Sequence, residues 1–246
     1  MDLPLDQDEL VAAVAAVNPR TVVVLNTGSP VPMPWLDDVA AVLQVWFGGQ
    51  ELGDGLADVL TGAAEPSGRL PVTFPRRMED TPAYLAHPGD DGKAPYPEGL
   101  FFGHRWYDAR DIEPLFPFGH GLSYTTFKLE GLKVTPDKIG PAGEATVSVD
   151  VTNTGARAGD EVVQLYVRDR VASVTRPVRE LRGFERVTLA PGERKTITFK
   201  VGPAALRFTD EQMNRVVEPG MFDLMVGTSS KTTATTPLEV VDRRTP

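Results

Sequence analysis

The sequence predicts an α/β unit with a mostly parallel sheet, followed by an all-β sandwich. Two apolar runs, residues 21–26 and 41–47, lack the alternation of a half-exposed strand, as expected for parallel strands that are covered on both faces. From about residue 127, apolar and polar residues instead alternate along several short runs, which is typical of antiparallel strands with one wet face. We therefore expect one unit at residues 1–126 and a second at residues 127–246.

The first unit begins with a predicted helix over residues 8–17. Apolar residues recur there at the spacing of one helical face, Asp8 is a suitable N-cap, and Pro19 ends the pattern. The segment between the two strands is long enough for a short helical crossover. A second helix is expected over residues 51–60, with Gly62 as its stop. These elements make only part of a layered α/β domain.

Residues 65–123 are rich in proline, glycine and aromatic residues and show little periodicity. This composition predicts long ordered loops with short strands. Loops of this kind carry function or form interfaces more often than average.

The second unit is expected to hold several short antiparallel strands. The alternating apolar positions are Val147, Val149, Val151, Val163, Leu165, Val167, Ile197, Phe199, Val201, Phe222, Leu224 and Val226. Turn signals separate these runs at residues 153–155, 191–193 and 219–220. The pattern predicts an immunoglobulin-like β-sandwich. Residues 237–241 are expected to form its last strand, before a frayed tail that ends at residue 246.

Composition narrows the classes of partner and chemistry. The 246 residues carry a formal net charge of -9, which argues against a nucleic-acid or anionic-membrane partner. Cysteine is absent, so the chain has no disulfide, no thiolate metal site and no cysteine nucleophile. No apolar run approaches the roughly 20 residues of a membrane span, and the first residues do not form a signal peptide. On these grounds a cytoplasmic location is slightly favoured.

Several strings carry a family resemblance. In order along the chain they are VVVLNTGSPVPMPW, AVLQVWFGGQELGDGLADVLTG, PSGRLPVTFP, YPEGLFFGHRWYD and PLFPFGHGLSYTTF. Together they resemble the C-terminal region of glycoside hydrolase family 3, the β-glucosidase family. Three later strings, EVVQLYVRD, RPVRELRGFERVTLAPGE and VEPGMFDLMVGTSS, resemble its fibronectin type III-like domain. The resemblance runs from about Asp2 to Ser230.

The resemblance implies a retaining, exo-acting hydrolase of terminal β-linked glycosides. Such enzymes need two carboxylates roughly 5 Å apart. In the family an Asp nucleophile comes from a (β/α)8-type barrel, and a Glu acid/base comes from a loop shortly before the stretch that matches DLPLDQDEL. Both positions would precede this chain, so we assign it no catalytic residue and expect Met1 to be an internal position of a longer protein.

Glu98, Trp106 and Tyr107 are the candidates for sugar contact. Glu98 stands among aromatic residues, but a role in ordering the loop through the backbone or Arg105 is favoured. Trp106 and Tyr107 could stack on sugar rings, although packing between domains explains them at least as well.

Other polar residues have structural explanations. Glu51 and Asp54 lie at a helix start, where acids complement the helix dipole, so we do not interpret them as a catalytic pair. The three histidines, His87, His104 and His120, lack metal-ligand spacing, and we expect no metal and no cofactor. The sequence also has no GxSxG elbow and no P-loop lysine.

Three functional hypotheses follow. The first is the C-terminal portion of a β-glucosidase-like hydrolase, inactive by itself, whose full-length form acts on a β-linked glucoside or oligosaccharide. The second is a stand-alone carbohydrate- or protein-binding module. The third is a split-gene subunit that docks a separate barrel, or self-associates, through an apolar face left on the α/β unit.

Overall fold

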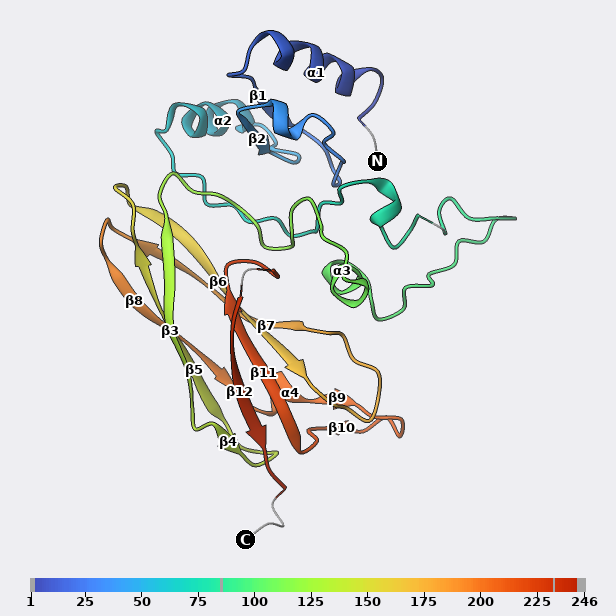
Figure 1. Ribbon diagram of the computed structural model, residues 1–246, viewed down its shortest axis with the longest axis vertical. Coiled ribbons are helices and arrows are strands. Elements are labelled where there is room, and N and C mark those ends of the chain that lie inside the picture. Colours follow the sequence, from blue (N-terminus) through green and yellow to red (C-terminus); the bar gives the residue numbers. More distant parts are fainter. Residues whose placement is uncertain (1–2, 85, 232, 243–246) are drawn as a thin grey trace.

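A computed structural model describes residues 3–84, 86–231 and 233–242. A small N-terminal group of helices and strands lies above one end of a β-sandwich, and a long stretch with little regular structure runs between them (Figure 1). The elements before the sandwich are α1 (Gln7–Val17), β1 (Val22–Leu25), the 3-10 turn η1 (Leu36–Asp38), β2 (Ala41–Gln44), α2 (Leu52–Thr61), the 3-10 turn η2 (Met78–Asp80) and α3 (His104–Arg110).

The predicted parallel pair is confirmed, in a shorter form. β1 and β2 run parallel, with Val22 opposite Ala41 and Leu25 opposite Gln44. β2 ends before the predicted residue 47, because Trp46 adopts a positive φ of 53°, which a strand cannot contain. The expectation that both strands are covered on both faces is wrong, since only Leu25 is buried among their residues.

Both predicted helices form, but Asp8 is not the N-cap of the first. Asp6 occupies that position without a side-chain hydrogen bond. Asp8 lies inside α1, where its carboxylate accepts a hydrogen bond of 2.7 Å from the indole N–H of Trp35. The stop at Gly62 is confirmed, with the left-handed φ of 76° that favours glycine.

The segment after α2 is ordered by pairings that are distant in sequence. Phe74 forms an antiparallel bridge with Phe116, and its buried ring packs in a small core around Trp35. The prediction of loops with short strands missed α3, whose seven residues are too short and too polar to show a helical period.

The sandwich is confirmed as two antiparallel sheets with one parallel edge pair. The larger sheet has the order β4-β12-β11-β6-β7 and the smaller one β3-β5-β8. The bounds are β3 (Phe127–Thr135), β4 (Lys138–Ile139), β5 (Ala145–Asn153), β6 (Gly159–Asp169), β7 (Glu180–Leu189), β8 (Arg194–Val201), α4 (Pro203–Leu206), β9 (Phe208–Thr209), β10 (Arg215–Val216), β11 (Gly220–Gly227) and β12 (Thr233–Val240). All twelve alternating apolar residues that the sequence singles out are buried between the sheets. Residues 237–240 of the predicted last strand lie in β12, which ends one residue before the predicted bound. Residues 243–246 of the predicted tail fall outside the described part.

Candidate functional site

Glu98 lies in a tight turn that leads into α3. Its backbone carbonyl accepts a hydrogen bond of 2.9 Å from Phe101 N–H. Within the described residues its half-exposed carboxylate has no hydrogen-bond or ion-pair partner. The suggested partner Arg105 instead forms an ion pair with Glu180, with 3.5 Å between Nη2 and Oε1. The carboxylate is therefore open to a ligand.

Trp106 and Tyr107 anchor α3 to its surroundings. Tyr107 is only 3% exposed, and burial, helped by the charge of Asp80, raises its pKa to about 12. The indole N–H of Trp106 donates to the Asp80 carbonyl at 3.0 Å, and the Arg110 guanidinium lies 3.8 Å from a ring centroid of the indole. This geometry favours the packing explanation for both residues, while sugar contact by them stays a prediction.

Asp108 joins α3 to the sandwich through a buried ion pair. Its carboxylate lies 3.1 Å from Arg179 Nε and 3.8 Å from Lys231 Nζ, and its side chain is 1% exposed. Burial raises the pKa of Asp108, and the two cations oppose that shift. Such a pair holds the helix in place because neither charge can be left alone without a large cost.

His104 packs against the sandwich one turn earlier in α3. Its ring lies 5.1 Å from the Phe118 ring and meets the edge of Tyr166 at 6.0 Å. Burial, together with the neighbouring charges of Arg105 and Arg179, lowers the pKa of His104 to about 4. The imidazole is therefore neutral at pH 7 and serves as a packed aromatic ring.

A second buried ion pair joins the loop after α2 to β6. Arg69 donates to Glu161 Oε1 from Nη2 at 2.8 Å and from Nε at 3.1 Å, and the two side chains are 7% and 9% exposed. The same carboxylate oxygen accepts the N–H of Val162 at 2.7 Å. Sequence reasoning missed Glu161, although the alternation along β6 could have identified it. Glu161 lies two residues before Val163 and four before Leu165, so its side chain points to the same buried side of the strand as theirs.

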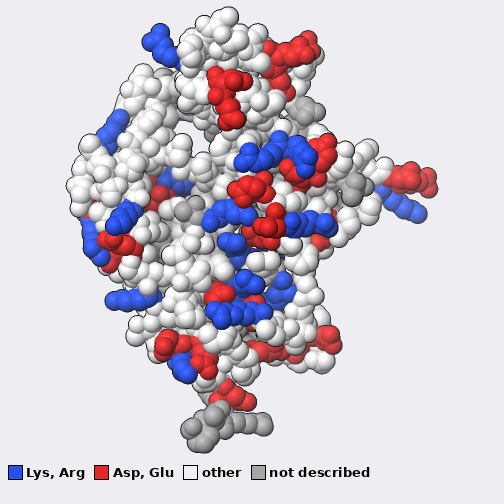
Figure 2. All heavy atoms as spheres, in the orientation of Figure 1, with Lys and Arg blue, Asp and Glu red and all other residues white. Residues whose placement is uncertain are grey.

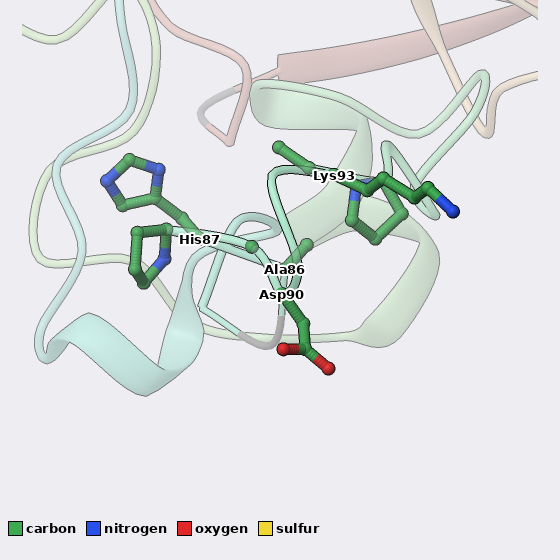
Figure 3. A pocket seen from close by; sticks show the side chains of 8 residues that line it. Ala86, His87, Asp90 and Lys93 are labelled. Carbon is green, nitrogen blue, oxygen red and sulfur yellow. The ribbon is translucent and has the colours of Figure 1, made fainter.

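The remaining polar candidates do not converge. A shallow pocket of about 550 Å³ is lined by His87, Asp90 and Lys93, but these side chains point in different directions (Figure 3). Glu51 and Asp54 are exposed at the start of α2. Within residues 3–84, 86–231 and 233–242 no group of three potential metal ligands is present, and no helix has the length and apolar character of a membrane span. On the face in Figure 2, positive and negative side chains are interleaved rather than gathered by sign.

Apolar side chains remain exposed on several elements of the N-terminal part, and we refer to them together as the apolar face. These residues come from α1, β1, the loop after β2 and α2, and they are Leu10, Val14, Val17, Val22, Val24, Phe47 and Leu60. A parallel sheet normally has both faces covered, so a two-stranded one with exposed valines is structurally incomplete. Patches of this kind mark interaction surfaces.

Comparison with known proteins identifies the family. The model of the "Glycosyl hydrolase family 3 C-terminal domain" matches residues 1–124, and that of the "Fibronectin type III-like domain" matches residues 161–230. The chain belongs to glycoside hydrolase family 3. Thermostable β-glucosidase B from Acetivibrio thermocellus is 49% identical over 232 residues, which is 94% of this chain and 31% of that protein. A β-glucosidase from Rhizobium radiobacter is 49% identical over 94% of the chain and 29% of its own length.

Solved structures of family 3 members share the fold. A β-glucosidase from Kluyveromyces marxianus in complex with glucose superimposes with a TM-score of 0.89 at 42% identity, over 98% of this chain and 29% of that one. A β-glucosidase from Bifidobacterium adolescentis superimposes with a TM-score of 0.90 at 39% identity. The match covers 100% of this chain and 38% of that one. The chain thus spans about a third of the length of its relatives and matches their C-terminal part.

Removing the buried charge of Glu161 should loosen the contact between the loops and the sandwich. Glu161→Gln leaves the Arg69 guanidinium buried and uncompensated, so we expect a loss of about 3 kcal/mol in the free energy of unfolding. Urea unfolding followed by tryptophan fluorescence measures it. Glu144→Gln is the control. It removes an ion pair whose side chains are largely exposed, 55% for Glu144 and 68% for Lys200, and should change the free energy of unfolding by less than about 0.5 kcal/mol. Equal effects of the two variants would contradict this assignment.

His104 should make the protein less stable in acid. The unfolded histidine takes up a proton near pH 6.5 and the folded one only near pH 4, so stability falls as the pH drops through that interval, by about 3 kcal/mol. His104→Phe keeps an aromatic ring and should lack this loss. Asp108 shifts stability in the opposite direction and His120 in the same direction, but both remain in the variant. The difference between the two pH profiles of stability therefore isolates His104, and parallel profiles would refute the prediction.

Proposed function

We propose that this chain functions as the C-terminal region of a retaining, exo-acting β-glucosidase-like hydrolase that releases sugar from terminal β-linked glucosides or oligosaccharides. Its share would comprise residues 1–126 as part of the α/β sandwich domain and residues 127–246 as the fibronectin type III-like domain. The names of the relatives and their shared fold support a carbohydrate substrate. The nucleophile and the acid/base would be supplied by polypeptide outside this chain.

The uncovered apolar face is the observation that carries the proposal. The edge and face of a two-stranded parallel sheet offer backbone and side-chain partners for further strands and helices. The occupant that fits is the preceding part of a family 3 enzyme, since the relatives extend over about three times the length of this chain. Within the assembled enzyme, Glu98 would contact the sugar with its free carboxylate.

Two alternative functions can be distinguished from this proposal by experiment. A stand-alone sugar-binding module is supported by Tyr96 and Phe102, which are exposed beside Glu98. Self-association would use the apolar face for a second copy. The first predicts saturable binding of methyl β-D-glucoside by the chain alone, and the second predicts a dimer whose population rises with concentration in sedimentation.

Complementation tests the proposal directly. The purified chain alone should not hydrolyse an aryl β-glucoside, and activity should appear when it is mixed with the part of the Acetivibrio enzyme that precedes the matching region. Leu10→Asp and Phe47→Asp place charges on the apolar face and should lower the recovered activity at least tenfold, about 1.4 kcal/mol. Val171→Asp changes a residue of the loop after β6 that is as exposed as Phe47, and should have no effect.

Turnover by the chain alone that is lost in Glu98→Gln would overturn this function. Equal recovery with Leu10→Asp and Val171→Asp would show that the apolar face does not receive the missing part.

A further inference from the structure

Glu180, at the start of β7, is the meeting point of three guanidinium groups. Arg176 and Arg182 approach its Oε2 at 2.8 Å and 2.9 Å from within the sandwich. Arg105 approaches Oε1 from α3 at 3.5 Å. Burial opposes ionisation of Glu180, but these cations lower its pKa below the usual value, so the carboxylate stays charged.

Arg105 makes a second contact on the other side. Its guanidinium carbon lies 5.0 Å from the centroid of the Phe102 ring, within the range of a cation–π interaction. The N–H of Arg105 also donates to the Phe102 carbonyl at 3.2 Å. Arg105 therefore ties the sandwich to the residue that directly follows the Glu98 turn.

The turn itself has little other support. Tyr96, Leu100 and Phe102 are all exposed, and two glycines with left-handed φ, Gly99 and Gly103, bend the backbone around them. A residue carried on such a loop reaches a defined position only when neighbouring contacts hold the loop. The Arg105 side chain supplies contacts of that kind at the end of the turn.

We propose that Arg105 and Glu180 are positioning residues, which hold residues 96–103 so that Glu98 presents its carboxylate to the sugar. The inference rests on the proposed sugar contact of Glu98. It gives the fibronectin-like domain a specific part in the enzyme, which is to set the geometry of a substrate-binding loop that belongs to the neighbouring domain.

Arg105 is the better of the two residues to change. Without Arg105, Glu180 keeps two arginine partners, so the sandwich retains a neutralised carboxylate. Without Glu180, three cations would face one another, and a general loss of stability would hide the local effect.

Amide hydrogen exchange of the full chain provides the main test. Arg105→Ala should raise the exchange rate of the Phe101 amide, which donates to the Glu98 carbonyl, at least tenfold and leave the amides of β11 unchanged. Arg105→Lys retains a cation beside Glu180 and should restore part of the protection. Arg168→Ala removes an exposed side chain of β6 that makes no ion pair or hydrogen bond to any described residue, and should match the wild type.

A sugar readout separates this inference from the proposed function. In the complemented enzyme, Arg105→Ala and Glu98→Gln should both raise KM for an aryl β-glucoside several-fold. Unchanged exchange in Arg105→Ala overturns the positioning role, whatever the kinetics show. Faster exchange in Arg105→Ala with an unaltered KM in Glu98→Gln overturns the sugar contact of Glu98 and keeps the hold of Arg105 on the turn.

Discussion

The buried ion pair between Arg69 and Glu161 is the contact on which the arrangement of the molecule depends. The stretch between α2 and β3 has few strands of its own, and it finds partners for its polar groups on the sandwich. Arg157 donates to the Gly62 carbonyl at 2.6 Å, and Ser230 N–H donates to the Phe118 carbonyl at 2.9 Å. Buried backbone groups without partners are costly, so these contacts with the sandwich help this stretch to keep its shape.

The two apolar cores explain why the connection is polar. One core fills the sandwich, and the other surrounds Trp35 and Phe74 in the N-terminal part. The surface between them is joined largely by ion pairs and hydrogen bonds, among which Arg179 with Asp108 and Arg105 with Glu180 fix α3. Directional contacts of this kind set position more strictly than apolar contact does. The fibronectin-like domain can thereby fix the position of a loop outside itself.

Periodicity in the sequence predicted those parts of the fold that the burial of apolar side chains determines. Alternation located the strands of the sandwich, and continuous apolar runs located the parallel pair. It failed where contacts between distant residues decide the structure. Asp8 has the chemistry of an N-cap, but a tryptophan 27 residues away takes its carboxylate. α3 is held by partners from β7 and from the loop before β12, which no local pattern reveals. The same holds for the candidate site. The aromatic residues around Glu98 single it out in the sequence. The contact of Arg105 with the loop that carries Glu98 could not be predicted, because Arg105 also pairs with Glu180, 75 residues further along the chain.

Cooperativity of unfolding tests the central claim, that the sandwich and the loops before it form one unit. All three tryptophans, Trp35, Trp46 and Trp106, lie before the sandwich, whereas most of the strands lie within it. Urea unfolding followed by tryptophan fluorescence and by far-ultraviolet circular dichroism therefore reports on the two parts separately. A single unit predicts coincident transitions with one midpoint. A fluorescence change that is complete before the β-sheet signal begins to fall would contradict it.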